Sequence, residues 1–295
     1  MNFFIYSFSY DENSGGIIAL HRLCHIINSN TEHKAYLVSN NWPFPFWKSL
    51  RYKIKNKSFL KIRNEWNTPI WNEKKFPKDA VVIYPEIING NPLGIKKVVR
   101  WFLHNPGHFT NHIVYGSLAF YFQYHSGFNH YKPDNDSIIS NNILNVGYYP
   151  VDIYTYTTDI VKDIETCYMY RKGKGKSKVH EENAICLDNA SHDYISEIMK
   201  RSKTFISYDP YTAYSKFAVL SGCNSIIVPD SGVTIEEWLP LDKDRYGISY
   251  GFSLEQLEWA KNTKTLLLKA IEQKENVTVE NVKICLNDIQ QFFNK

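Results

Sequence analysis

The sequence lacks several features that assign a chain to a functional class on sight. Its 295 residues contain no GxGxxG dinucleotide fingerprint, no P-loop and no HExxH zinc motif. No apolar run reaches the length of about eighteen residues that a membrane-spanning helix requires. The N-terminus has neither a basic segment nor a long apolar core, so we expect no secretory signal peptide. A soluble or peripheral protein is the resulting expectation.

Charge and cysteine usage narrow the class further. The 34 Lys and Arg residues and the 30 Asp and Glu residues give a net charge of +4, which is weaker than nucleic-acid-binding proteins show. The five cysteines are scattered and lack metal-ligand spacing, which favours reduced, buried thiols. We therefore expect a cytoplasmic protein that uses no metal ion, no other cofactor and no nucleic-acid partner.

Strand-like and helix-like segments alternate along the chain. The β-rich run FFIYSFSY ends at the turn DENSGG, and apolar residues then recur with helical spacing between Ile17 and Ile27. A connector rich in Tyr and Thr, near residues 148–163, separates two alternating halves. Such alternation is typical of a parallel sheet covered by helices. We expect an α/β protein with two Rossmann-like α/β/α domains, residues 1–155 and 156–295, a ligand cleft between them, and helices at the C-terminus of the second domain.

A basic turn follows the first strand expected in the second domain. The sequence YRKGKGK places Arg171, Lys172 and Lys174 around Gly173. Ligands of parallel sheets bind at the carboxyl ends of strands, where glycines let N–H groups approach an anion and cations neutralise it. The turn therefore suits a diphosphate, although an exposed basic turn without a ligand has the same composition.

Polar residues also follow two later strands of that domain, in SYDPYT and PDSG. The tyrosine rings can stack on a base or sugar, and the carboxylates can bind hydroxyls or serve in catalysis. Each residue also fits a local role, because Asp, Ser and Thr cap helices. Their position at neighbouring strand ends favours a shared ligand site, whose members here are Tyr208, Asp209, Tyr211, Thr212, Asp230 and Ser231.

The first domain carries a smaller set of candidates. Gly15 and Gly16 open its first helix, where backbone N–H groups meet anions or hydroxyls. Asp11 and Glu12 precede them and offer either a general base or a capping group. His104 follows a later strand, in LHNPGH, where it can contact a ligand or relay a proton.

A segment between residues 42 and 63 interleaves aromatic and basic side chains and contains no acid. This composition favours an anionic membrane surface as a partner. An insertion packed against its own domain is the alternative, and single-stranded nucleic acid is a more distant one.

Four stretches of the sequence resemble a known family. They are KKVVRWFLHNPG, YMYRKGKGK, SYDPYTAYSKFAVLSGCNSIIVPDSG and DRYGISYGFSLEQLEWAKNT, within residues 81–265. They are similar to GT-B glycosyltransferases of bacterial capsule and lipopolysaccharide biosynthesis. The resemblance implies metal-independent transfer of a sugar from a nucleotide-sugar donor to an oligosaccharide or lipid-linked glycan acceptor. It also implies a cytoplasmic enzyme, peripheral on the inner membrane.

The resemblance assigns roles to the candidates. The basic turn would neutralise the leaving diphosphate, His104 would face the donor, and Asp11 or Glu12 would be the base of an inverting reaction. Many retaining members carry two glutamates eight residues apart, but those places hold Asp209 and Phe217 here. Phe217 cannot bind ribose hydroxyls, so the stereochemistry and the usual ribose contact stay open.

Other functions also stay open. A non-catalytic module that binds nucleotide sugars or glycans within an assembly complex would show the same residues without turnover. A sugar-nucleotide epimerase of similar fold would need a pair of bases near the sugar, and the sequence supplies no convincing pair.

Overall fold

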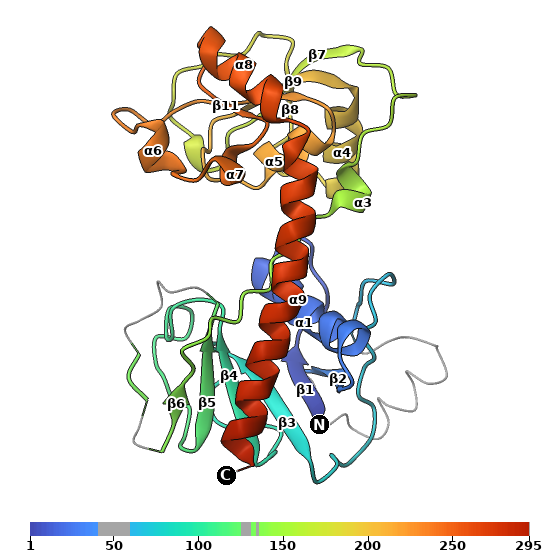
Figure 1. Cartoon of the computed structure of the whole chain (residues 1–295), viewed down its shortest axis with the longest axis vertical. Helices are drawn as coiled ribbons and strands as arrows, with labels where there is room; N and C mark the ends of the chain where they lie inside the picture. The colour runs from blue at the N-terminus through green and yellow to red at the C-terminus, as the bar shows by residue number, and fades with distance from the viewer. Residues whose placement is uncertain (41–59, 125–130, 134–135, 295) are drawn as a thin grey trace. The chain divides into compact units, whose positions relative to one another are not determined.

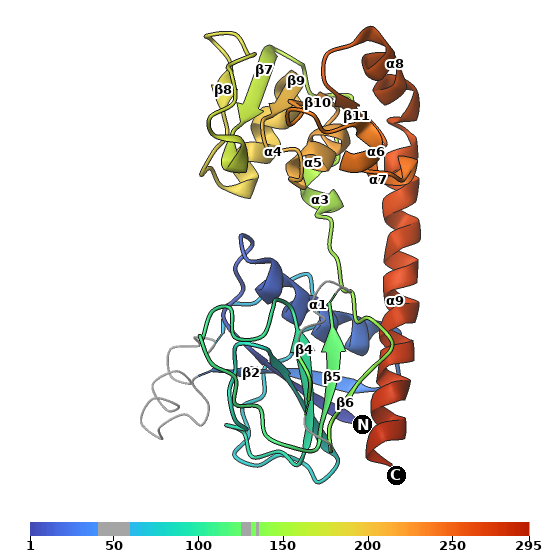
Figure 2. The same cartoon turned by 90° about the vertical axis from the view of Figure 1, so that its left-hand side faces the viewer.

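Two compact units make up the part of the chain that the computed structural model describes, namely residues 1–40, 60–124, 131–133 and 136–294. Unit 1 consists of Met1–Tyr148 together with Glu275–Lys295, and unit 2 consists of Tyr149–Lys274. The described part of each unit contains a parallel sheet (Figures 1 and 2). The expectation of an α/β protein with two parallel sheets is confirmed.

The sheet of unit 1 has the strand order β2-β1-β3-β4-β5-β6, and its paired strands are parallel. Its strands are apolar runs rich in aromatic and β-branched residues, which suit strands buried on both faces. The strand order reverses at β1, because β2 lies on one side of it and β3 on the other. The strands are β1 (Asn2–Ser7), β2 (Lys34–Ser39), β3 (Ala80–Pro85), β4 (Lys97–Phe102), β5 (Ala119–Gln123) and β6 (Ile138–Ile139).

Different kinds of element cover the two faces of this sheet. Helix α1 (Gly15–Asn30) and the later turns of α9 (Leu266–Phe293) pack on one face, as Figure 1 shows. The other face packs against loop residues, among them Ile95 and Tyr115. The segment between β3 and β4 is short, and the one between β4 and β5 carries Asn-Pro-Gly and forms an irregular loop. Helices therefore cover one face within the described residues, whereas the expectation was helices on both.

An apolar stripe attaches α9 to unit 1. Val282, Cys285, Leu286 and Ile289 follow helical spacing and lie in the same buried cluster as β1 and α1. Polar contacts add to this packing, because Asp288 accepts hydrogen bonds from Ser140 and Asn142 at 2.9 and 2.8 Å.

The end of the chain therefore folds with its beginning. The sequence placed all C-terminal helices in the second domain and divided the domains after residue 155, whereas the units divide after Tyr148 and again after Lys274. An amphipathic helix signals that it needs a partner surface but does not say which surface, so the pattern alone could not assign α9.

The sheet of unit 2 has the order β11-β10-β9-β7-β8, and its paired strands are also parallel. Its order reverses at β7, which has β8 on one side and β9 on the other. The strands are β7 (Ile164–Met169), β8 (Ile185–Cys186), β9 (Ser202–Ser207), β10 (Asn224–Ile227) and β11 (Ile248–Tyr250). The helices are α3 (Val151–Tyr154), η1 (Arg171–Gly173), α4 (His192–Arg201), α5 (Tyr214–Leu220), α6 (Ile235–Trp238), α7 (Asp242–Arg245) and α8 (Leu254–Thr263).

Two half-buried lysines lie at the amino edge of this sheet. Lys162 donates hydrogen bonds to three backbone carbonyls at the ends of α4 and α5, and Lys264 donates to those of Gly222 and Cys223. Cations stabilise the carbonyl ends of helices, although burial lowers the pKa of both lysines. Gly222 is required in this turn because its φ is +84° and a Cβ would lie 2.9 Å from the ring of Tyr156. The Ser-Gly-Cys turn is thus a structural junction at the edge opposite the candidate ligand site.

No helix within the described residues is both long and apolar enough to cross a membrane.

Candidate functional site

The carboxyl edge of the unit 2 sheet gathers the polar segments of that unit. Met169 at the end of β7 pairs with Ser207 at the end of β9, and Ser207 pairs with Ile227 at the end of β10. The basic turn, the SYDPYT segment and the PDSG segment therefore leave the sheet at adjacent strand ends. This edge includes the point where the strand order reverses, which is where open α/β sheets bind their ligands.

The backbone of the basic turn already holds an anion. Asp188, which follows β8, accepts the N–H groups of Tyr170 and Arg171 on its two carboxylate oxygens, each at 3.1 Å. Asp188 was missing from the sequence-based candidates. An acid placed just after a short strand was the available signal, but its contact joins two segments that are distant in sequence.

Gly173 serves packing in this turn. A Cβ at this position would lie 2.0 Å from the carbonyl oxygen of Tyr208, so only glycine fits. Gly173 is buried, and its N–H donates to the carbonyl of Tyr170 at 2.7 Å. We predicted that it would let the backbone approach a phosphate, whereas the structure places it beneath β9.

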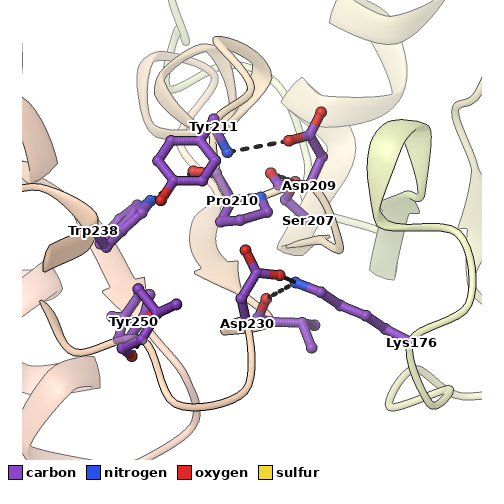
Figure 3. Close-up of polar contacts among 10 residues, drawn as sticks. Lys176, Ser207, Asp209, Pro210, Tyr211, Asp230, Trp238 and Tyr250 are labelled. Carbon is purple, nitrogen blue, oxygen red and sulfur yellow. Dashed lines mark hydrogen bonds and ion pairs between the residues drawn. The ribbon is translucent and has the colours of Figure 1, made fainter.

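The basic side chains remain available on this turn. Arg171, Lys172 and Lys174 are exposed and take part in none of the ion pairs among the described residues. The guanidinium of Arg171 lies over the ring of Tyr214, 5.1 Å from its centroid. Lys176 bonds to Asp230 at 2.6 Å, which joins the basic turn to the loop after β10 (Figure 3).

An exposed tyrosine is fixed beside these charges. Tyr211 is 64% exposed, and its N–H donates to Asp209 Oδ1 at 3.1 Å. The carbonyl of Pro210 accepts the indole N–H of Trp238 at 2.8 Å, and Trp238 stacks on Tyr250 (Figure 3). Asp209 and Trp238 therefore hold the two polar groups of the peptide bond between Pro210 and Tyr211, and the ring of Tyr211 is exposed to a ligand. Asp209 is buried and stabilises the turn before α5, whereas the N-cap position that we weighed as its alternative is held by Ala213.

Tyr208 does not face solvent. It has no exposed surface, and its hydroxyl accepts the N–H of Val179 at 2.8 Å and bonds to His180 Nδ1 at 2.7 Å. Burial lowers the pKa of His180, and the charge of Lys178 lowers it further. We predicted that Tyr208 would stack on a ligand, but its ring is buried among those of Tyr168, Tyr170 and His180.

The remaining candidates of unit 2 fall into two groups. Thr212 accepts the N–H of Tyr214 at 3.3 Å, so it supports the start of α5. Phe217 is buried and stacks on Tyr154 at 4.5 Å, which is ordinary core packing. Ser231 is exposed in the loop beside Asp230, where a ligand can reach it.

The first candidates of unit 1 lie at the start of α1. Ser14 is the N-cap residue and accepts the N–H of Ile17, so Gly15 is the first residue of the helix. Gly15 has open space around its Cα, and Gly16 lies beside Leu103 of the loop after β4. Asp11 accepts the N–H of Asn13 at 3.0 Å in the turn before α1, where Ser14 and not Asp11 is the N-cap, and Glu12 is exposed.

A buried acid lies at the end of β3, near His104. Glu86 accepts the N–H of Leu103 at 3.0 Å, while its carbonyl accepts the Tyr115 hydroxyl at 2.6 Å. The rings of His104 and His108 lie 4.2 Å apart. Burial raises the pKa of Glu86, and N–H groups of the backbone, including that of His104, offset part of the rise. Glu86 was also missing from the sequence-based candidates, because a lone Glu after a strand carries no pattern.

Replacing Glu86 by glutamine is expected to change the pH dependence of stability. The raised pKa means that the folded state keeps this proton to a higher pH than the unfolded chain does. Stability therefore falls as the pH rises from the ordinary value for Glu, about 4.3, through the raised value. Urea unfolding across this pH range should show that the free energy of unfolding of Glu86→Gln increases relative to that of the wild type as the pH rises. An exposed control, Glu32→Gln, should show no such gain, and a flat difference for Glu86→Gln would contradict the assignment.

One further motif has a structural role. The sequence Gly247–Gly251 reads GISYG, a pattern that can mark a nucleophilic serine. Ser249 is buried within β11 and donates to the carbonyl of Gly251 at 2.7 Å, so it is not on an exposed elbow. Among the residues that the structure describes, no group of three or more His, Cys, Asp or Glu side chains could hold a metal ion.

The aromatic and basic segment that we assigned to a membrane surface lies outside the described residues over positions 42–59. Compared with protein-family models and with curated proteins, the chain matches no family model and no curated protein.

Proposed function

We propose that this chain is a GT-B glycosyltransferase that moves a sugar from a nucleotide-sugar donor to a growing bacterial surface glycan. The observation that carries the proposal lies at the carboxyl edge of the unit 2 sheet. Three exposed cations on a fixed turn, an exposed tyrosine and Asp230 meet there, at the reversal of strand order. A diphosphate flanked by a planar base and a sugar matches this combination of charge, ring and carboxylate.

The residues divide into those that contact the donor and those that shape the site. Arg171, Lys172 and Lys174 neutralise the leaving diphosphate, and this contribution grows as negative charge develops in the transition state. Tyr211 stacks on the base or the sugar. Asp230, which Lys176 orients, accepts sugar hydroxyl groups.

Buried residues give the site its shape. Tyr208 and Gly173 pack the basic turn onto β9, and Asp209 fixes the backbone of Tyr211. In this proposal, unit 1 is the acceptor-side unit, Asp11 or Glu12 is the candidate base of an inverting reaction, and His104 contacts the donor or relays a proton. The proposal includes a cytoplasmic location and contact of residues 42–63 with an anionic membrane.

Thermal shift measurements with UDP, GDP, CDP, ADP and TDP test the donor site. One nucleotide is expected to raise the melting temperature, because a ligand at one hundred times its Kd adds about 2.7 kcal/mol to the free energy of unfolding. Arg171→Ala should abolish most of that shift. The matched control is Lys203→Ala, since Lys203 is the second residue of β9, near the opposite edge of the sheet, and pairs with Glu165. It should retain the full shift.

A protein that no nucleotide stabilises would contradict the donor site, as would equal shifts for wild type and Arg171→Ala. The second measurement is release of nucleoside diphosphate from the matching nucleotide sugars. Binding without release, for any donor or added glycan, would support the non-catalytic module instead.

A further inference from the structure

The start of the basic turn has an unusual backbone for a stretch without glycine. Tyr170 lies in the right-handed helical region, with φ −87° and ψ −53°, and Arg171 has a φ of +45°. Successive residues in right-handed and then left-handed conformations point their N–H groups into one concavity, which binds anions. Residues other than glycine adopt the left-handed conformation at a cost in free energy, so the surrounding structure must hold it in place.

Asp188 is the group that holds it. Its two carboxylate oxygens each accept one N–H from this concavity, at 3.1 Å. Hydrogen bonds to an ionised acceptor are stronger than neutral ones, and two of them fix the turn in orientation as well as in place. The carboxylate of Asp188 is therefore bound by the backbone N–H groups of Tyr170 and Arg171, next to the cationic side chains of the turn.

The far end of the turn is anchored in a similar way. Lys176 bonds to Asp230 at 2.6 Å and to the carbonyl of Val228 at 2.7 Å. Between the two anchors, Gly173 packs under the carbonyl of Tyr208. Arg171, Lys172 and Lys174 thus project from a turn that is fixed at both ends and in the middle.

We propose that Asp188 is a positioning residue of the anion site at the carboxyl edge of the unit 2 sheet. It fills the backbone concavity itself, so a bound diphosphate is held by the cationic side chains and not by the N–H groups of Tyr170 and Arg171. Its carboxylate keeps those side chains in a binding-ready arrangement. The inference rests on the proposed donor site and adds to it a residue that does not touch the donor.

The direction in which anion affinity changes when the Asp188 carboxylate is removed distinguishes a positioning role from simple charge repulsion. Removing a negative charge near a phosphate site should tighten anion binding if the charge acts only by repulsion. If Asp188 positions the turn, Asp188→Ala should weaken binding of the stabilising nucleoside diphosphate, and of inorganic pyrophosphate, by about tenfold. The matched control is Glu182→Gln, which removes an exposed acid from the loop between β7 and β8 and should leave binding within about twofold.

Amide hydrogen exchange without any ligand supplies the second readout. Asp188→Ala should speed exchange of the Tyr170 and Arg171 amides, whereas amides in the core of β9 stay protected. Asp188→Asn should restore protection to one of the two amides, because its side chain has one carbonyl oxygen. A general loss of structure would instead speed exchange throughout unit 2.

The outcomes separate the two proposals. Unchanged exchange at both amides in Asp188→Ala, or tighter nucleotide binding by that variant, would overturn the role of Asp188. If the wild type binds neither pyrophosphate nor any nucleoside diphosphate, both the donor site and the positioning role of Asp188 are wrong. The exchange data would then still decide whether Asp188 fills the backbone concavity. Faster exchange together with about tenfold weaker binding supports both.

Discussion

Replacing Arg100 by methionine is expected to lower the free energy of unfolding by about 3–5 kcal/mol. Arg100 lies in β4 without exposed surface and donates hydrogen bonds to the carbonyls of Ile88, Gly90 and Tyr115. Its guanidinium also lies over the rings of Tyr84 and Tyr115, 5.4 and 4.4 Å from their centroids. Methionine fills much of the same volume but donates nothing, so three carbonyl oxygens lose their donor.

The effect should be largest in the two loops that carry Glu86 and His104. Ile88 and Gly90 follow β3, and Tyr115 lies in the loop after β4 that begins at Leu103. Hydrogen exchange should therefore speed up in these two loops before it does in β1. Their conformation depends on a cation that the sheet buries.

Urea unfolding measures this loss, and Arg201→Met provides the same substitution at an exposed site. Arg201 pairs with Asp163 and Glu197, and both partners are exposed. Exposed pairs contribute about 0–1 kcal/mol, so this variant should remain close to the wild type. A loss below about 1 kcal/mol for Arg100→Met would show that the carbonyl oxygens find other donors.

Replacing Gly173 by alanine is expected to destabilise the protein by about 3 kcal/mol and to remove nucleotide binding. The new Cβ would lie 2.0 Å from the carbonyl oxygen of Tyr208 and 2.3 Å from its carbonyl carbon. These are backbone atoms at the end of β9, and the N–H of Tyr208 already donates to the carbonyl of Met169. The basic turn must therefore move away from the sheet, and it carries Arg171 and Lys172 with it.

Gly15→Ala is the matched control for that prediction. Gly15 is the first residue of α1, and a Cβ there meets nothing within 4 Å. Alanine should therefore leave stability unchanged or raise it by up to about 1 kcal/mol. Urea unfolding of both variants compares their stabilities, and nucleotide thermal shifts compare Gly173→Ala with the wild type. A Gly173→Ala protein with the stability and nucleotide response of the wild type would contradict the close packing of the turn.

Several residues that were predicted to contact the ligand instead stabilise the conformation of their neighbours in the structure. Tyr208, Asp209 and Gly173 each hold a neighbour in place by packing or by a backbone hydrogen bond. Tyr211 and Asp230 keep exposed surface at the same edge. The sequence placed all five after strand ends, and only the fold distinguishes the two groups, because the burial of each depends on packing against segments that are distant in the sequence.

The missed residues have a common physical cause. Asp188 and Glu86 are single acids whose partners lie elsewhere in the chain, at Tyr170 and Arg171 in one case and at Leu103 in the other. No local spacing marks such a residue, because its role is a contact between neighbouring strand ends. Such contacts can be inferred only once the strand order is known.

The sequence by itself determined the parallel sheets, because continuous apolar runs are typical of strands buried on both faces. It also determined which segments leave the sheet at its carboxyl edge, since each follows a strand. It did not determine what covers the sheets, since the connections between β3, β4 and β5 are loops where strand–helix alternation was expected. The tertiary structure decided where α9 packs, which side chains at that edge stay exposed, and which acid fills the backbone concavity at Arg171. Those outcomes depend on contacts between distant segments, and a local pattern carries no information about its distant partner.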